Sequence, residues 1–415
     1  MHSVFVVPRF HPYPGGYENY ILWLARHLRD SGHGVTVLTT TAYDLESFWL
    51  PGFRNLPPGP LDMERIKVVR LPISYDRWSR RAARLLALLP DWRLRAQFAR
   101  PSFSVPGLTA HLRQLPRMDV IHIGPLPYNR LMYEGWREGR RRGARVLATP
   151  CTHFGESSNR AVTRHYTQPF QIALLQHCDH VLTLTDVERQ RLLAAGVPAG
   201  KVWNTGAGID TSEVTGGDAA ALRAKYGIHG PLVLHLGTKA ADKGSLAVLA
   251  AMQRLWADGC DAWLAMVGSS LSEFDEHLRR HPPAGPRLLN LGPVSPGEKR
   301  DLLATATLLV HPSRVESLGL VYLEAWANGL PVIAADTPVS REVIAHGSDG
   351  LLVPFGDVAQ LAGAIRRLLE EPELRRSLGL AGKKKAESRF SWKAAADRIY
   401  PFFQRESPEP VRTAV

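Results

Sequence analysis

The sequence predicts an α/β protein with two doubly wound parallel sheets, and three features support this prediction. The chain has 415 residues, which is too long for one ordinary hydrophobic core and favours two domains. Short apolar runs alternate with segments of helical periodicity, the pattern of parallel strands linked by helices. Loops rich in glycine follow several of these runs, as they do at the ligand-binding edge of such sheets.

The first half of the chain contains the strands of one predicted domain. Residues 3–7 form a short apolar run, followed by a Pro/Gly loop and by helical periodicity over residues 20–29. Further strands are predicted at residues 35–40, 119–123, 145–149, 179–184 and 201–203. We therefore predict an N-terminal domain over residues 1–205.

A stretch rich in Gly and Ala at residues 216–230 precedes the second series of strands. These strands are predicted at residues 231–236, 262–267, 288–291, 307–310, 331–334 and 350–353. We predict a C-terminal domain over residues 206–390, with a hinge near residues 205–230. Residues 391–405 are expected to form a helix that packs back on the N-terminal domain, and residues 406–415 a disordered tail.

The composition is typical of a soluble globular protein, with 45% hydrophobic and 22% charged residues. No apolar run approaches the roughly 18 residues that span a bilayer, and the N-terminus lacks a leader pattern, so we expect a cytoplasmic protein. Cys151, Cys178 and Cys260 are odd in number and far apart, which argues against a disulfide framework.

The net charge of +12 is concentrated in one region of the chain. Residues 51–150 hold 19 Lys and Arg against 7 Asp and Glu, which accounts for the whole excess. A basic balance fits nucleic acid, an anionic membrane surface or an anionic small molecule. Zinc-finger spacing, aromatic RNA-binding signatures and basic-zipper heptads do not occur in the sequence, so nucleic acid is not expected as a partner.

The first of three loops suited to an anion follows the first predicted strand and reads Pro12-Tyr-Pro-Gly-Gly-Tyr-Glu18. Gly15 and Gly16 let the backbone approach a phosphate closely, and Glu18 fits the first turn of the following helix. A surface turn followed by an acid explains the same residues equally well.

The second loop reads Leu236-Gly-Thr-Lys-Ala-Ala-Asp-Lys-Gly244 and also follows a predicted strand. Lys239 and Lys243 are placed to neutralise a diphosphate, and Gly237 keeps the loop open. The loop does not match the Walker A pattern. Two solvated lysines on a surface loop are the alternative interpretation.

The third segment runs from Arg314 to Pro331 and carries Glu316 and Glu324, eight positions apart. The helix that ends at Gly329 is predicted to begin near residues 317–319, so Glu316 precedes the helix and Glu324 lies inside it. The amides of residues 318–320 would then be free for an anion, because the first amides of a helix have no partner within it.

Together these motifs resemble family 4 of the glycosyltransferases, which are retaining enzymes of the GT-B fold. The resemblance rests on the E-x7-E spacing followed by A-x-A-x-G-x-P-V, on the upstream loop ending in Lys-Gly and on the N-terminal Gly-Gly-x-Glu. It covers residues 4–403, with the motifs in the order of the family. It implies two Rossmann-like domains facing across a cleft, the first for the acceptor and the second for a nucleotide-sugar donor.

The resemblance also implies roles for individual residues. Lys243 would bind the donor phosphates, Glu316 the transferred sugar and Glu324 the ribose hydroxyls. His153 corresponds to the family's histidine near the reacting sugar, and residues 292–294 would receive the base. The catalytic residues implied are His153, Lys243 and Glu316. The donor-binding residues implied are Gly15, Gly16, Gly237, Thr238, Lys239, Lys243, Val294, Glu316, Ser317, Leu318, Gly319, Leu320 and Glu324. Thr238 departs from the family's arginine, and Lys239 is expected to supply that charge.

The implied activity is transfer of a sugar, with retention, from a nucleotide-diphosphate sugar to a lipid, saccharide or small-molecule acceptor. UDP- and GDP-sugars are the expected co-substrates, and no cofactor or metal is expected. Two alternatives stay open at this point: a sugar-nucleotide epimerase of the same fold and a non-catalytic nucleotide-sugar-binding subunit. Cys and His residues near position 151 and at 177–180 could suggest zinc, but their spacing fits no standard zinc pattern.

A basic amphipathic helix is predicted within the basic region. Its cationic face consists of Arg77, Arg80, Arg81 and Arg84. One interpretation is an ordinary surface helix that covers the core of the domain. The other is contact with the cytoplasmic membrane face, where a lipid-linked or anionic acceptor would be found, and this would make the protein peripheral to the membrane.

Overall fold

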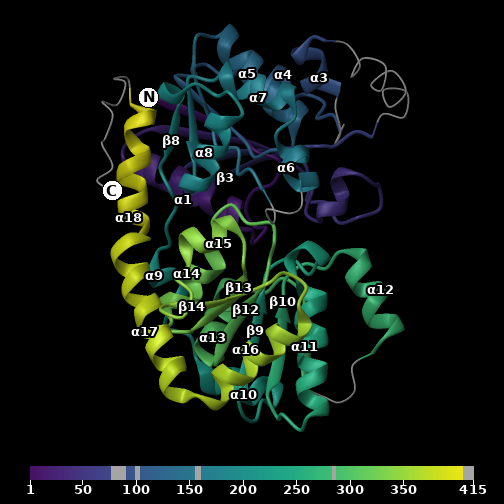
Figure 1. Cartoon of the computed structure of the whole chain (residues 1–415). Helices are drawn as coiled ribbons and strands as arrows, with labels where there is room; N and C mark the ends of the chain where they lie inside the picture. Colours follow the sequence, from purple (N-terminus) through teal and green to yellow (C-terminus); the bar gives the residue numbers. More distant parts are fainter. Residues whose placement is uncertain (76–89, 99–102, 155–159, 283–286, 405–415) are drawn as a thin grey trace. The chain divides into compact units, whose positions relative to one another are not determined.

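The computed structural model describes residues 1–75, 90–98, 103–154, 160–282 and 287–404. The chain forms two compact units, which we describe separately (Figure 1). Unit 1 comprises Met1–His153, Ala161–Gly206 and Ala396–Val415, and unit 2 comprises Phe154–Arg160 and Ala207–Ala395. Each unit contains one largely parallel sheet, which confirms the predicted fold class. No helix within the described ranges is long and apolar enough to cross a membrane.

Unit 1 is built on an eight-stranded sheet in the order β3-β4-β2-β1-β5-β6-β7-β8. The strands are β1 (His2–Val6), β2 (Gly34–Thr40), β3 (Gly59–Met63), β4 (Ile66–Leu71), β5 (Val120–Ile123), β6 (Arg145–Ala148), β7 (His180–Thr183) and β8 (Val202–Asn204). β1 pairs with β2 on one side and with β5 on the other, both in parallel register. The strand order therefore reverses at β1, and the carboxyl ends of β1 and β5 form the switch point where α/β proteins bind ligands.

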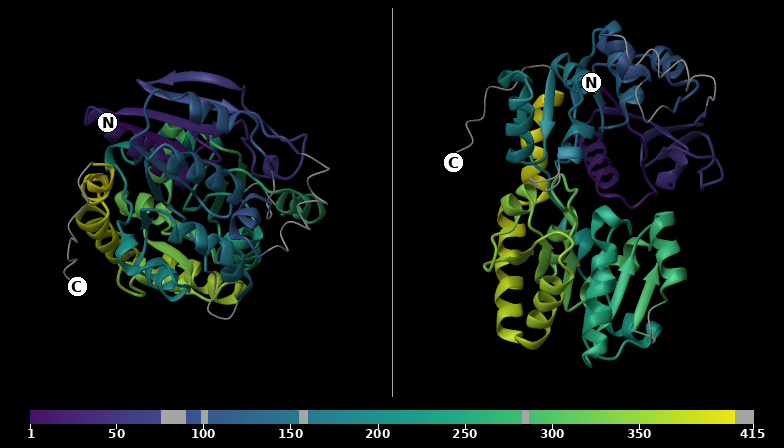
Figure 2. Two further views of the ribbon diagram at one scale, coloured as in Figure 1. Left: turned by 90° about the horizontal axis from the view of Figure 1, so that it is seen from above. Right: turned by 45° about the vertical axis from the view of Figure 1, so that its right-hand side comes forward.

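The hairpin of β3 and β4 is an element that the sequence prediction missed. The two strands pair antiparallel and form one edge of the sheet (Figure 2). Their two-residue turn consists of Glu64 and Arg65, which have φ values of 52° and 65°. Such turns usually contain Asn or Gly, because both central residues need positive φ. The composition of this turn therefore gave no hairpin signal, and Pro60 argued against a strand, although Pro is tolerated at a sheet edge.

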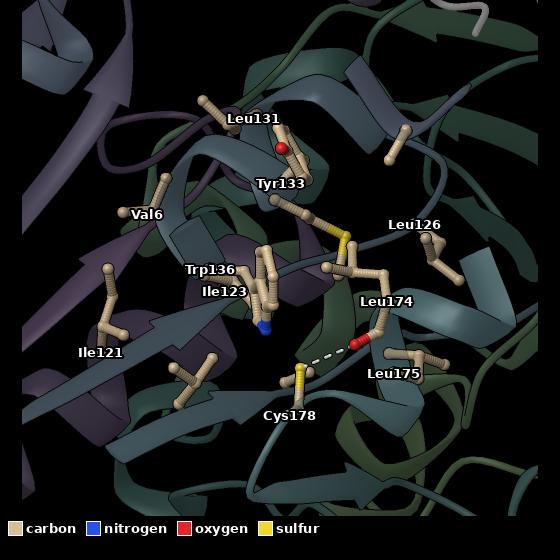
Figure 3. Packing of buried hydrophobic residues seen from close by; sticks show 14 of the residues in the cluster. Val6, Ile121, Ile123, Leu126, Leu131, Tyr133, Trp136, Leu174, Leu175 and Cys178 are labelled. Carbon is tan, nitrogen blue, oxygen red and sulfur yellow. Dashed lines mark hydrogen bonds between the residues drawn. The ribbon is translucent and has the colours of Figure 1, made fainter. Parts of the chain in front are cut away.

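Helices cover both faces of the unit 1 sheet. They are α1 (Gly16–Asp30), α3 (Trp92–Phe98), α4 (Leu108–Gln114), α5 (Asn129–Arg141), α6 (Arg160–Tyr166), α7 (Pro169–Gln176) and α8 (Asp186–Ala194). Trp136 of α5 packs among Ile121, Ile123 and Leu175 in the main core of the unit (Figure 3). On the opposite face, the Phe5 ring lies 5.3 Å from the His122 ring and 6.0 Å from the Phe403 ring. Phe403, which is far from these strands in the sequence, thus contributes to the core of unit 1.

Unit 2 contains a six-stranded parallel sheet in the order β11-β10-β9-β12-β13-β14. The strands are β9 (Leu232–Leu236), β10 (Trp263–Val267), β11 (Leu288–Leu291), β12 (Leu308–His311), β13 (Val332–Ala335) and β14 (Gly350–Val353). β9 pairs with β10 on one side and with β12 on the other, so this sheet also has a switch point. Nearly every residue of β9, β10, β12, β13 and β14 is buried, as expected for a parallel sheet covered on both faces, whereas the edge strand β11 is only partly buried.

The helices of unit 2 form two layers around its sheet (Figure 1). α11 (Ser245–Ala257) and α16 (Val358–Glu370) contact each other over one face, whereas α14 (Leu320–Ala327) and α17 (Pro372–Arg389) contact each other over the opposite face. The remaining helices are α9 (Thr211–Val214), α10 (Ala219–Tyr226), α12 (Ser272–Arg280), α13 (Pro296–Thr305) and α15 (Pro338–Val343). Helix α18 (Trp392–Ile399) begins in unit 2 and ends in unit 1. The loops at the carboxyl ends of β9, β11 and β12, together with α14, carry the predicted donor residues of this unit.

Candidate active site

The loop after β9 begins with a glycine that lies directly over a histidine of the neighbouring strand. Gly237 has φ 141°, and a Cβ at this position would lie 3.1 Å from Cε1 of His311. Its N–H donates to the carbonyl of Val267 at the end of β10 (2.9 Å). A side chain would therefore be strained and crowded here, which explains the need for glycine.

Lys243 and Glu316 meet at the switch point of unit 2. Lys243 ends the short 3₁₀ helix η3 (Ala241–Lys243), and its Nζ lies 2.6 Å from Oε1 of Glu316 and 2.8 Å from the carbonyl of Val315. Nε2 of His311 lies 2.9 Å from the same Glu316 oxygen. Burial would raise the pKa of Glu316, but the Lys243 charge and the His311 hydrogen bond outweigh it, and the pKa lies well below its usual value. The carboxylate is therefore ionised at neutral pH.

The other carboxylate oxygen of Glu316, Oε2, has no hydrogen-bond partner among the described residues. Because Oε1 already accepts from Lys243 and His311, the carboxylate is fixed in orientation while Oε2 stays available. A fixed carboxylate with one available oxygen can accept hydrogen bonds from the hydroxyl groups of a sugar.

Helix α14 begins at Leu320, close to the predicted start, and its first amides are unoccupied. Gly319 caps the helix with φ 87°, and no side chain accepts a hydrogen bond at this end. Within the described residues, the N–H groups of Leu318, Gly319 and Leu320 have no acceptor. Three free amides at a helix N-terminus attract a negative charge. Glu316 lies two residues before Leu318, in the loop that leads into the helix, as predicted.

Glu324 lies within α14 and is almost fully buried. Its Oε1 accepts a hydrogen bond from Nζ of Lys299 on α13, at 2.5 Å. Its Oε2 is buried and has no partner in the described part of the chain. An unpaired buried carboxylate oxygen is costly, so this atom is an expected contact point for a ligand hydroxyl.

Lys239 does not lie with Lys243, although both belong to the same loop. Its side chain is buried, and its Nζ donates to Oδ1 of Asn290 (2.6 Å) and to the carbonyl of Leu291 (2.8 Å). Burial lowers the pKa of Lys239 to about 8. The preceding Thr238 is half-buried. A phosphate contact by Lys239 stays a prediction, and it would require the ammonium to leave both protein acceptors.

Val294, the residue predicted to face the base, lies in the loop between β11 and α13. It is half-buried, whereas Gly292 and Pro293 before it are exposed. The loop starts directly after Leu291, the residue whose carbonyl Lys239 binds. The backbone of residues 292–294 is thus at the surface, at the carboxyl end of an edge strand.

The remaining predicted residues belong to unit 1: Gly15 and Gly16 follow β1 at the switch point of its sheet, whereas His153 follows β6. Gly15 and Gly16 form the start of α1, and Glu18 in the first turn pairs with Nε of Arg9 at 2.9 Å. A Cβ on Gly15 would overlap the Glu18 carboxylate. His153 follows β6 and is half-buried, with its ring edge-on to the ring of Tyr166 at 4.8 Å.

The structure therefore joins Lys243 to Glu316 and places Glu324 inside α14, the helix that follows Glu316, whereas the ammonium of Lys239 binds other groups. His311 and Lys299 were missed, although each holds one of the two predicted acids. A signal existed for His311, because it directly precedes the Pro-Ser that ends its strand. Lys299 lies on a separate helix, and a spacing of 25 residues from Glu324 does not predict a contact from the sequence.

Two further predictions from the sequence concern a metal and a membrane helix. Among the described residues, no group of three or more His, Cys, Asp or Glu side chains is placed to hold a metal ion. Cys178 is buried, its thiol bonds to the carbonyl of Leu174, and burial raises its pKa to about 12. The predicted basic face at residues 77–84 lies outside the described residues.

Both halves of the sequence match known protein families. Residues 218–385 match the family described as glycosyl transferases group 1, and residues 15–203 match the glycosyl transferase 4-like domain. The chain is 25% identical to the phosphatidyl-myo-inositol mannosyltransferase of Mycolicibacterium smegmatis, over 99% of this chain and 95% of that protein. It is 31% identical to the GDP-mannose-dependent monoacylated alpha-(1-6)-phosphatidylinositol monomannoside mannosyltransferase of Corynebacterium glutamicum, over 48% of this chain and only 55% of that protein.

Solved structures show a similar fold over almost the whole chain. Sucrose-phosphate synthase from Thermosynechococcus elongatus superposes with a TM-score of 0.72 at 22% identity, covering 97% of this chain and 98% of that one. Anabaena Alr3699/HepE in complex with UDP-glucose gives a TM-score of 0.73 at 18% identity, covering 97% of this chain and 99% of that one. Identities this low support the common fold and carry no information on the substrate.

Proposed function

The chain belongs to the glycosyl transferases group 1 family and has the GT-B fold, and we propose that it is a retaining glycosyltransferase that uses a nucleoside-diphosphate sugar. The observation that carries the proposal is the arrangement around α14. An ionised Glu316, fixed by Lys243 and His311, lies two residues before the three free amides at the N-terminus of α14. Glu324 within α14 presents a buried oxygen that has no partner among the described residues.

These groups correspond to the parts of one donor molecule. The diphosphate would bind the amides of residues 318–320 and the ammonium of Lys243, because both attract negative charge. Oε2 of Glu316 would accept a hydrogen bond from the transferred sugar, and Oε2 of Glu324 from the ribose. The exposed backbone of residues 292–294 would contact the base. The roles that the resemblance implies for Gly15 and Gly16 at the donor diphosphate, and for His153 near the reacting sugar, stay predictions.

The same groups account for the chemistry that we propose. The bond between the anomeric carbon and the diphosphate oxygen breaks, so negative charge develops on the leaving phosphate and positive charge on the sugar. Lys243 and the helix amides would stabilise the leaving group, which is usually the largest contribution to such catalysis. The acceptor hydroxyl would attack from the face that the diphosphate leaves, and its proton would pass to a phosphate oxygen. This route gives retention without a protein base.

For the acceptor, we propose the hydroxyl group of an anionic molecule such as an inositol phosphate or a phosphoinositide. The names of two relatives include phosphatidylinositol acceptors. The positive charge of residues 51–150 supports the same choice, because a basic surface attracts anionic acceptors. A lipid acceptor would make the protein peripheral to the inner face of the membrane. Binding to anionic but not to neutral liposomes is expected, and equal negligible binding to both would remove the membrane contact.

The donor can be identified by thermal shift with UDP-, GDP- and ADP-sugars, because a ligand that binds only the folded state raises the melting temperature. We expect UDP- or GDP-sugars to stabilise the protein, since GDP-mannose and UDP-glucose occur with its relatives. Transfer of labelled sugar from the stabilising donor to phosphatidylinositol or inositol phosphate is the direct assay. Stabilisation by none of the donors would contradict the proposal, and sugar release that no acceptor accelerates would argue against transfer.

A further inference from the structure

Lys239 lies two residues after Gly237 in the loop predicted to bind phosphate, yet its ammonium is directed elsewhere. The residue is 2% exposed, and Nζ lies 2.6 Å from Oδ1 of Asn290 and 2.8 Å from the carbonyl of Leu291. Both acceptors belong to the carboxyl end of β11, whereas Lys239 follows β9. Because β10 lies between these strands, the side chain spans the end of a whole strand.

The backbone holds this arrangement in place. The N–H of Lys239 donates to the carbonyl of Ser269 (2.7 Å), and the carbonyl of Lys239 accepts from the N–H of Leu271 (3.0 Å). Gly268 approaches the loop so closely that a Cβ would lie 2.1 Å from the carbonyl oxygen of Gly237. The ends of β9 and β10 are thus joined by backbone contacts, and the lysine ammonium extends the connection to β11.

Burying the Lys239 ammonium at this position costs free energy, so its presence indicates a specific role. Removing an ammonium from water costs several kcal/mol unless good acceptors replace the solvent. Here one amide and one carbonyl replace it, the Phe274 ring lies 5.8 Å away, and the carboxylate of Asp275 lowers the cost through its charge. A lysine that served the diphosphate would keep its ammonium accessible, as Lys243 does with a quarter of its side chain exposed.

We propose that Lys239 is a positioning residue for the nucleobase of the donor: by holding Asn290 and the Leu291 carbonyl, it fixes the backbone of residues 292–294, and it does not bind the diphosphate. The loop begins at the residue after the bound carbonyl, so a change at Lys239 is transmitted to it directly. The inference rests on the proposed function, because it takes residues 292–294 as the part of the site that receives the base.

The experiment compares Lys239→Met with Lys243→Met, using isothermal titration with two probes. One probe is the nucleoside diphosphate that best stabilises the wild-type protein, and the other is inorganic pyrophosphate. Lys239→Met should weaken nucleoside diphosphate binding about tenfold or more, leave pyrophosphate binding within about twofold, and reduce the preference among UDP, GDP and ADP. Lys243→Met should weaken binding of both probes, because it removes a phosphate contact.

Asn290→Ala provides a second variant, which tests the same contact without a substitution in the core. Asn290 is exposed, so its replacement should leave the fold intact and produce the same selective loss in a weaker form. Equal weakening of both probes in Lys239→Met, or wild-type binding of the nucleoside diphosphate in both variants, would overturn the inference. If the wild-type protein binds pyrophosphate but no nucleoside diphosphate, the proposed donor site itself fails, which is a different result.

Discussion

Nζ of Lys243 lies 2.6 Å from Oε1 of Glu316, and this contact joins two loops that are 73 residues apart in the chain. The lysine also binds the carbonyl of Val315, so it holds the residue before Glu316 as well. The contact gives the carboxylate a fixed orientation at the N-terminus of α14. It also partly neutralises Glu316, which would otherwise repel an incoming diphosphate.

Glu316→Gln should reduce sugar transfer about 100-fold or more while the protein stays folded. The substitution keeps the size of the side chain but removes the charge that would stabilise the positive sugar in the transition state. Initial rates at saturating donor, together with near-UV circular dichroism, test this expectation. Glu373→Gln is the matched control, because Glu373 is exposed on α17 and pairs with a surface arginine. Full activity of Glu316→Gln would contradict the assigned role.

Glu324→Gln should weaken donor binding through the ribose and leave the sugar end unaffected. Since Oε2 of Glu324 has no protein partner in the described residues, a ribose hydroxyl is expected to bind it. The wild-type protein should bind a 2′- or 3′-deoxynucleoside diphosphate about 10- to 100-fold more weakly than the ribonucleotide, as for the loss of a hydrogen bond to a charged group. Glu324→Gln should bind the two nucleotides about equally.

Titration calorimetry with both nucleotides measures this coupling between the acid and the hydroxyl. Glu370→Gln, an exposed acid at the end of α16, should keep the wild-type discrimination. If Glu324→Gln still discriminates between the two nucleotides as strongly as the wild type, Glu324 does not contact the ribose.

Gly319→Ala should destabilise the protein more than Gly329→Ala, although both glycines flank the same helix. Both have positive φ, 87° and 72°, so alanine costs about 1 kcal/mol of backbone strain at either position. At Gly319 a Cβ would also lie 2.3 Å from the Tyr322 ring, whereas at Gly329 it would meet no atom within 4 Å. Urea unfolding of the two variants measures the difference in their free energies of unfolding, which we expect to be about 1–3 kcal/mol. Equal midpoints would show that the ring moves aside without cost.

The stability of unit 2 should decrease as the pH falls below about 6.5, in part because of His235. Burial, reinforced by the neighbouring His311, lowers the pKa of His235 to about 3. Between pH 6.5 and 3 the unfolded chain therefore binds a proton at this residue that the folded protein does not bind. The free energy of unfolding should then fall by about 1.4 kcal/mol per pH unit from this residue alone.

Urea unfolding at pH 7.5 and pH 5.5 tests this contribution in the variant His235→Gln. The variant should lose less stability between the two pH values than the wild type, whatever its stability at pH 7.5. His229→Gln is the control, because His229 is exposed on the loop before β9 and should leave the pH dependence unchanged. An identical pH dependence in His235→Gln and the wild type would contradict the assignment.

The interior strands of both sheets were predictable because they are buried on both faces. Such strands read as continuous apolar runs, and each of their predicted ends lies within one residue of the observed end. The hairpin of β3 and β4 was not predictable, because it lies at a sheet edge with exposed residues and its Glu64-Arg65 turn lacks the usual composition. Tertiary pairing with β2 stabilises this hairpin in spite of its sequence.

The sequence by itself determined which loops follow the strands, that Glu316 precedes helix α14 and that Glu324 lies within it, because these features depend on local periodicity and helix termination. Only the tertiary structure decided which side chains contact one another. Glu316 binds Lys243 and His311, and Glu324 binds Lys299. Lys239 binds Asn290 and does not join Lys243 at Glu316. Which side chains meet depends on the order and register of the strands, and these are set by packing between segments distant in the chain. Two lysines four residues apart in one loop therefore reach different strand ends.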